Sequence, residues 1–179
     1  MNSFVMADPR LCDGCQTCME ACVEVHQQAG LQARPRLYVM QTAQGSMPVQ
    51  CHQCMNGPCA AICPVGAITQ KGDAVHLDEK RCIGCKMCAI VCPFGAISPY
   101  GDSFTSQAAG LAPVASTGAA AKHNVVAKCD LCSFRAEGPA CIGACPNGAL
   151  RLIRDIEVER TLADRRRGSA AVLEVSARP

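Results

Sequence analysis

The chain has 179 residues, a net charge of +2 and sixteen cysteines, with no tryptophan, two tyrosines and four phenylalanines. The nearly balanced charge argues against strong nucleic-acid binding, and the few aromatic residues argue against a conventional apolar core. Cysteine at this density indicates a scaffold held together through bonds to sulfur.

The N-terminal segment does not resemble a targeting signal. MNSFVMADPR lacks the basic and apolar regions of a secretory leader, and no apolar stretch is long enough to span a membrane. We therefore expect a cytoplasmic protein that reaches the inner face of a membrane only through partners. Export in complex with a partner that carries a signal stays open. In a reducing cytoplasm, clustered cysteines bind metal more often than they form disulfides.

The cysteines form four tetrads, and none is left over. In chain order the tetrads are Cys12, Cys15, Cys18, Cys22; Cys51, Cys54, Cys59, Cys63; Cys82, Cys85, Cys88, Cys92; and Cys129, Cys132, Cys141, Cys145. The first and third have the spacing C-x2-C-x2-C-x3-C. The second and fourth have a longer gap and a Gly-Pro pair before their third cysteine. The repeat therefore comes in two kinds that alternate along the chain.

The predicted elements follow a repeated order of strand, cysteine loop, short helix, turn and strand. From the N-terminus, a strand in SFVMADPRLC precedes the first tetrad, and a helix covers residues 18–25. A helix over 59–62 and a strand in CPVGAITQ follow, then a hairpin turn at Lys71-Gly72-Asp73 and a strand in DAVHLDEKRC. A helix over 88–91 and a strand in CPFGAISP complete the third repeat. Strands in HNVVAKC and CPNGALRL flank the fourth tetrad.

Two segments lie outside the repeat. Residues 101–123 are rich in alanine and glycine and indicate a linker insertion. Residues 155–179 form a charged, weakly amphipathic tail. For this tail a surface helix, a docking segment and partial disorder are all open.

The third tetrad is followed by proline, and a C-x2-C-x2-C-x3-C-P run is typical of [4Fe–4S] ferredoxins. Its first three cysteines lie on a loop around one cluster, and in two-cluster ferredoxins the fourth ligates the other cluster. Zinc is the main alternative, but structural zinc sites combine separate C-x2-C pairs or add histidines. Four complete tetrads, three of them ending in Cys-Pro, favour iron–sulfur clusters.

An exchange of fourth cysteines requires the tetrads to pair. The shortest gap between tetrads is residues 64–81, so we expect tetrads two and three to form one unit. Tetrads one and four then close a second unit around it. The predicted ligand sets are Cys12, Cys15, Cys18 and Cys145 (cluster 1); Cys129, Cys132, Cys141 and Cys22 (cluster 2); Cys51, Cys54, Cys59 and Cys92 (cluster 3); and Cys82, Cys85, Cys88 and Cys63 (cluster 4).

This pairing predicts an α+β fold of two dicluster-ferredoxin units related by pseudo-symmetry, with short strands and short helices around four clusters. One unit is discontinuous and spans residues 1–46 with 124–154, and the inserted unit spans residues 47–100. The sequence contains no nucleophile–base pair, phosphate loop or nicotinamide motif. We therefore expect no catalytic residues.

Several polar residues adjoin the tetrads. Lys80, Lys86 and Lys128 would favour a reduced cluster if their ammonium groups lay close to it. For each of these lysines, however, we expect a solvated surface position. For His26 and His52, a surface position and a role as a hydrogen-bond donor are both open.

Four runs carry a family resemblance: VMADPRLCDGCQTC, CHQCMNGPC, RCIGCKMCAIVCPFGAI and KCDLCSFRAEGPAC. They resemble the four-cluster iron–sulfur subunits of molybdopterin oxidoreductase and hydrogenase complexes, in particular the small electron-transfer subunits of formate hydrogenlyase and hydrogenase-4. The resemblance covers residues 1–154 and implies the same nested pairing, four [4Fe–4S] clusters and no substrate site.

The same resemblance implies electron transfer between a catalytic subunit, expected to be a molybdopterin formate dehydrogenase, and a hydrogenase or another iron–sulfur subunit. Two alternatives are an accessory or maturation ferredoxin for these enzymes and the electron-transfer subunit of another oxidoreductase, such as carbon monoxide dehydrogenase. A zinc-binding interaction module is a third and weaker alternative.

Overall fold

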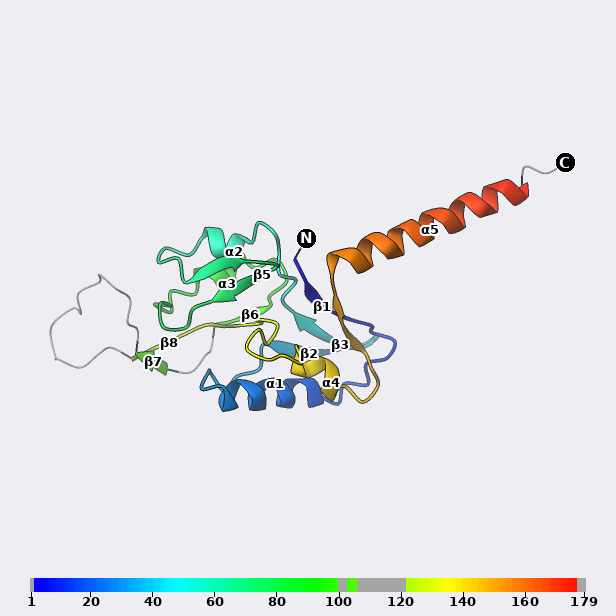
Figure 1. Cartoon of the computed structure of the whole chain (residues 1–179). Helices are drawn as coiled ribbons and strands as arrows, with labels where there is room; N and C mark the ends of the chain where they lie inside the picture. The colour runs from blue at the N-terminus through cyan, green and yellow to red at the C-terminus, as the bar shows by residue number, and fades with distance from the viewer. Residues whose placement is uncertain (1, 100–102, 106–121, 177–179) are drawn as a thin grey trace.

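The computed structural model describes residues 2–99, 103–105 and 122–176. The protein is a small mixed fold of short helices and short strands (Figure 1). In chain order the elements are β1 (Phe4–Ala7), α1 (Thr17–Gln28), β2 (Leu37–Thr42), β3 (Gly45–Gln50), α2 (Pro58–Ala61), β4 (Ile68–Lys71), β5 (Ala74–Leu77), α3 (Met87–Val91), β6 (Ile97–Ser98), β7 (Ser103–Thr105), β8 (Lys122–Asn124), β9 (Ala127–Lys128), α4 (Ala140–Ala144), β10 (Leu150–Ile153) and α5 (Asp155–Ser176).

The first part of the fold joins the two ends of the cysteine repeat. β1 and β10 pair as antiparallel strands, with Phe4 opposite Ile153 and Ala7 opposite Leu150. Beside this pair, α1 packs against α4. Since α1 carries the end of the first tetrad and α4 lies within the fourth, these two distant tetrads are neighbours in space.

The second part is built from the middle of the chain. β4 and β5 form the predicted hairpin, with Lys71 opposite Ala74. Gly72 has a φ of 60° in its turn, a backbone conformation that glycine adopts without steric cost. α2 packs against α3, so the second and third tetrads also lie together.

The two parts meet where β6 pairs with β9, with Ile97 opposite Lys128. Val125 and Val126, just before the fourth tetrad, are buried in the same apolar cluster as Val75 and Ile97. β3 runs across residues 46 and 47, where the sequence predicts the boundary between units. That division into units, and the pseudo-symmetry between them, stay predictions.

The interior of the protein is rich in sulfur. No phenylalanine or tyrosine is among the buried core residues of the described ranges, and the apolar members are small or aliphatic. Buried cysteines occupy many of the remaining core positions: Cys18, Cys22, Cys51, Cys59, Cys82, Cys88, Cys132 and Cys141. Cysteine therefore fills core positions that large apolar side chains occupy in most proteins.

Most elements agree with the sequence predictions. The helices expected over 18–25, 59–62 and 88–91 are present as α1, α2 and α3, and the strands expected beside the tetrads are present as well. The hairpin of β2 and β3, with Thr42 opposite Gly45, was not predicted. The short helix α4 was not predicted either.

The tail is helical over residues 155–176 and extends away from the rest of the protein (Figure 1). This projection leaves Ile156 and Leu162 of α5 exposed. The predicted linker over 101–123 falls mostly outside the described residues, apart from the pairing of β7 with β8. Among the described residues, no helix has the length and apolar character needed to cross a membrane.

Candidate functional site

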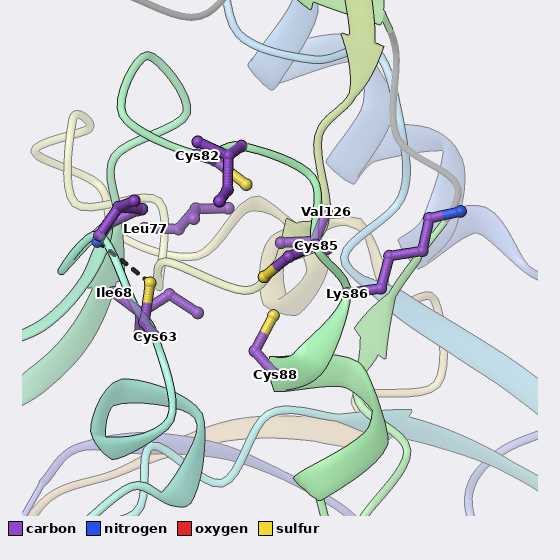
Figure 2. Close-up of a pocket in the computed structure, with 11 residues that line it drawn as sticks. Cys63, Ile68, Leu77, Cys82, Cys85, Lys86, Cys88 and Val126 are labelled. Atoms are coloured by element: carbon purple, nitrogen blue, oxygen red, sulfur yellow. Dashed lines mark hydrogen bonds between the residues drawn. The ribbon is translucent and has the colours of Figure 1, made fainter. Parts of the chain in front are cut away.

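One cavity is lined by four cysteine side chains and by apolar walls (Figure 2). The cysteines are Cys63, Cys82, Cys85 and Cys88. Three come from the third tetrad, and the fourth comes from the second. The group predicted from spacing for cluster 4 is thus gathered around one space.

A second cavity is also lined by four cysteines and by apolar side chains. Its cysteines are Cys51, Cys54, Cys59 and Cys92. Three belong to the second tetrad and one to the third. Each of the two cavities therefore holds three cysteines of one tetrad and the last cysteine of the other, which suits two occupants of the same kind.

The other eight cysteines lie around α1 and α4. Cys145, from the fourth tetrad, lies close enough to Cys18 to raise the pKa of its thiol, although burial is the larger cause. Cys141 is affected in the same way by Cys22 of the first tetrad and by Cys132. Cys18, Cys22 and Cys141 are buried in one apolar cluster. The structure therefore brings cysteines of tetrads one and four together, and the ligand exchange between them stays a prediction.

Burial keeps several of these thiols protonated in the absence of a cation. It is the main cause that raises the pKa of Cys88 and of Cys141 to about 12, and that of Cys18 and Cys132 to about 11. Metal coordination deprotonates a thiol because the ion replaces the proton. Each of the two cavities gathers four cysteine sulfurs, and four such soft donors fit an iron–sulfur cluster.

The cysteine loops of the first and third tetrads share a backbone shape. In the first and third tetrads, Gly14 and Gly84 have φ values of 82° and 69°, and Gln16 and Lys86 have φ values of 65° and 64°. In the second tetrad Gln53 has a positive φ, and in the fourth tetrad Leu131, Cys132 and Gly138 do. A non-glycine residue in this region costs about 1–2 kcal/mol. The likeness of the first and third tetrads in sequence is therefore also present in their backbones.

Backbone amides donate hydrogen bonds to the fourth cysteine of each Cys-Pro tetrad. The amide four residues later reaches the Sγ of Cys63, Cys92 and Cys145 at 3.2, 3.4 and 3.2 Å. Cys22 is not followed by proline, and its Sγ accepts instead from the amide of Arg36 at 3.4 Å. Hydrogen bonds to sulfur stabilise negative charge and tune the potential of a bound cluster.

His26 connects the first and fourth tetrads. Its side chain is buried, with Nδ1 2.6 Å from the carbonyl oxygen of Cys22 and Nε2 3.1 Å from Asp130. Burial by itself would lower the pKa of His26, but the hydrogen bonds to Asp130 and Cys22 and the charge of Asp130 together outweigh this effect and raise the pKa to about 9. His26 therefore belongs to the interior of the site. Sequence reasoning could not pair it with Asp130 because no local pattern connects the two positions.

Asp130 and Cys132 also approach His26, and the donor atoms of the three residues lie within 4.8 Å of one another. His26 and Asp130 are already hydrogen-bonded to each other, and Cys132 belongs to the fourth tetrad. His26 and Asp130 therefore lie directly beside the fourth tetrad.

The expected surface position of Lys128 is wrong. Only 1% of this residue is exposed, and its Nζ donates to the carbonyl oxygens of Val75 and Cys129 and to Oε1 of Gln53. Lys86 differs, because its ammonium group points away from the sulfur atoms of the first cavity (Figure 2). The tetrads therefore have one buried lysine neighbour in Lys128.

Comparison with known proteins agrees with this chemistry. Residues 75–98 match the family described as 4Fe-4S binding domain. The chain is 45% identical to hydrogenase-4 component A of Escherichia coli, over 96% of this chain and 92% of that protein. It is 43% identical to formate hydrogenlyase subunit 2 of E. coli, over 89% and 86% of the two chains.

A third relative is the electron transport protein HydN of E. coli, which is 39% identical over 95% of this chain and 98% of its own length. The active site complex BamBC of benzoyl coenzyme A reductase aligns with 98% of this chain, but with 16% identity and a TM-score of 0.36. These values are too low to show a shared fold. Its cysteine sites and these relatives show that the chain belongs to the ferredoxin-type [4Fe–4S] electron-transfer proteins that include hydrogenase-4 component A and formate hydrogenlyase subunit 2.

Proposed function

We propose that this chain binds four [4Fe–4S] clusters and relays electrons between a molybdopterin formate dehydrogenase and a hydrogenase. The observation that supports this proposal most directly is the sorting of cysteines between the two cavities. Each cavity receives three cysteines from one tetrad and one from the other. The ligand exchange of two-cluster ferredoxins would require this arrangement.

The proposed ligand sets follow the same rule throughout. They are Cys12, Cys15, Cys18 and Cys145 for cluster 1; Cys129, Cys132, Cys141 and Cys22 for cluster 2; Cys51, Cys54, Cys59 and Cys92 for cluster 3; and Cys82, Cys85, Cys88 and Cys63 for cluster 4. When bound, each cluster would accept and release electrons. The chain itself contributes the thiolates, the amide donors to sulfur and the apolar walls that exclude water.

Contacts between tetrads support a linear order for the relay. Cys51 lies close enough to Cys129 to affect the pKa of its thiol, although burial is the larger cause. Gln53 also donates to the carbonyl oxygen of Cys129 at 2.9 Å. Clusters 2 and 3 would therefore be adjacent at the centre. Cys15 and Cys85 are exposed, so clusters 1 and 4 would lie at the two ends.

The choice of partners comes from the relatives. Two of them are named as components of hydrogenase-4 and of formate hydrogenlyase, and both align along nearly their whole length. A chain that serves a comparable complex needs a donor at one end of the relay and an acceptor at the other. The cytoplasmic location at the inner face of a membrane stays a prediction.

A second candidate function is an accessory electron carrier that acts without permanent partners. The similarity to HydN favours it, because that relative is named only as an electron transport protein. Co-purification separates the two functions. A stable complex with a dehydrogenase or hydrogenase supports the relay subunit, and a protein isolated alone under the same conditions supports the carrier.

Metal analysis tests the proposed cofactors directly. Anaerobically purified protein is expected to contain about sixteen iron atoms and about sixteen sulfide ions per chain, as four cubane clusters require. The double variant Cys51→Ser/Cys54→Ser is the matched control and is expected to retain about twelve of each. Zinc without acid-labile sulfide in the wild-type protein would overturn the proposal.

A further inference from the structure

Lys128 is a buried cation at the junction of two tetrads. Its ammonium group donates to the carbonyl oxygen of Val75 at 2.5 Å, to that of Cys129 at 2.9 Å and to Oε1 of Gln53 at 3.2 Å. These oxygens are neutral. Within the ranges that the structure describes, no ion pair to Lys128 is formed.

The position of Lys128 is fixed by two contacts. Its backbone lies in β9, paired with Ile97 of β6. Gln53 holds its side chain from the other direction, because the same amide oxygen that accepts from Lys128 also accepts from the amide of Val75 at 2.9 Å. The ammonium group is therefore held in one place between the second and fourth tetrads.

Lys128 also acts electrostatically on cysteines of both tetrads. It lines the cavity that contains Cys54 and Cys59. Burial raises the pKa of these two thiols, and the positive charge of Lys128 opposes that rise. The same opposition applies to Cys129. The charge of Lys128 therefore acts on cysteines of two proposed ligand sets.

A buried ammonium group without a counter-charge is costly, because neutral carbonyl oxygens only partly replace its hydration. Thiolates and a bound iron–sulfur cluster would supply negative charge on both sides of Lys128. A fixed positive charge favours whichever redox state carries more negative charge. Lys128 would thus stabilise an added electron at the centre of the relay.

We propose that the positive charge of Lys128 raises the reduction potentials of the inner clusters 2 and 3 relative to those of the outer clusters. An added electron would therefore be favoured on the inner clusters. This inference rests on the proposed function, because it requires clusters in both ligand sets. A single electron would arrive from one outer cluster and leave to the other. No bond forms or breaks and no proton moves, since the lysine acts only through its charge.

The test compares three substitutions in the full-length holoprotein. Lys128→Met and Lys128→Gln remove the charge, and the glutamine keeps an amide that can donate to the same oxygens. Lys128→Arg keeps the charge. Lys86→Met is the matched control, because Lys86 also lies beside a tetrad but directs its ammonium group away from the sulfur atoms (Figure 2). Redox titration followed by electron paramagnetic resonance gives the potential of each cluster.

We expect Lys128→Met and Lys128→Gln to shift at least one inner cluster to a more negative potential. At a fixed solution potential, the ratio of reduced to oxidised cluster should fall about tenfold, which corresponds to about 59 mV for one electron. Lys128→Arg should restore the wild-type potential, and Lys86→Met should leave the potentials of clusters 2 and 3 unchanged. A merely structural role would change cluster content without this dependence on charge.

Each outcome has a defined consequence. If Lys128→Met loses iron, the comparison of Lys128→Gln with Lys128→Arg decides the question. Wild-type potentials in Lys128→Gln, with four clusters present, would overturn this inference and leave the proposed function intact. A wild-type protein without iron and sulfide would overturn both.

Discussion

In the tetrads that end in Cys-Pro, the fourth cysteine is directed by the proline that follows it. Cys92 and Cys145 end α3 and α4 with extended backbone, at φ −72° and ψ 113° and at φ −76° and ψ 111°. A following proline disfavours the helical conformation of the preceding residue, so Pro93 and Pro146 turn these cysteines out of their helices. The chain can therefore present the fourth sulfur to a site other than that of its own loop.

The exchange of ligands predicts the behaviour of a single substitution. Cys92→Ala should remove or damage the cluster held by Cys51, Cys54 and Cys59, because the cavity of those three residues contains Cys92. Its electron paramagnetic resonance spectrum should match that of Cys54→Ala. The control Cys85→Ala should instead match Cys63→Ala. A spectrum of Cys92→Ala that matches Cys85→Ala would reject the exchange.

Individual residues differ in how well the sequence predicts their position. The cysteines are predictable because their spacing is set by the geometry of a cluster. Lys128 is not, because lysine is rarely buried and the groups that hold it, at Gln53 and Val75, are far away in the chain. His26 is similar, since its partner Asp130 lies in a different tetrad.

At the scale of elements, the turn after each Cys-Pro pair is the best-determined feature. Gly66, Gly95 and Gly148 have φ values of 58°, 60° and 61°, and each amide donates to the carbonyl oxygen of the preceding cysteine at 3.2 Å. Only glycine adopts this backbone freely. The three turns lead into β4, β6 and β10, which explains why the strands after the tetrads were predictable.

Two glycine substitutions separate backbone strain from packing. Gly95→Ala should destabilise the protein by about 1–2 kcal/mol, because alanine resists a positive φ, and no atom lies within 4 Å of the added methyl group. Gly143→Ala is the control. Gly143 lies in α4, also in open space, and alanine there should stabilise the helix by up to about 1 kcal/mol. Loss of visible cluster absorbance in denaturant measures both, and equal effects would contradict the argument.

The hairpin of β2 and β3 shows why other elements were missed. It contains no cysteine, and Pro48 lies within β3, which argues against a strand when read from sequence alone. Pro48 is tolerated because β3 pairs only with β2 in the described structure, so the missing amide hydrogen disrupts no second ladder. A strand at an edge is decided by tertiary context, which the local sequence does not contain.

At the scale of the whole molecule, polar contacts join the two parts of the fold. Arg36, just before β2, forms a buried ion pair with Glu79, just after β5, at 2.6 Å. Lys128 and Gln53 form a second connection. Buried ion pairs add little net stability, but loss of one partner is costly. These contacts therefore specify how the two parts are placed more than they supply the free energy of folding.

That free energy should come largely from the clusters, because cysteine sulfur replaces much of the apolar core. Removal of iron is expected to unfold the chain, since binding and folding are coupled in small metal domains. Far-ultraviolet circular dichroism should lose its strand signal, amide resonances should collapse to a narrow range, and both should return on reconstitution with iron and sulfide. A chain that ends at Arg154 is the control, because it removes α5 as a source of residual helix. Native-like resonances in iron-free protein would mean that the small apolar clusters around Val75 and Leu150 are sufficient by themselves.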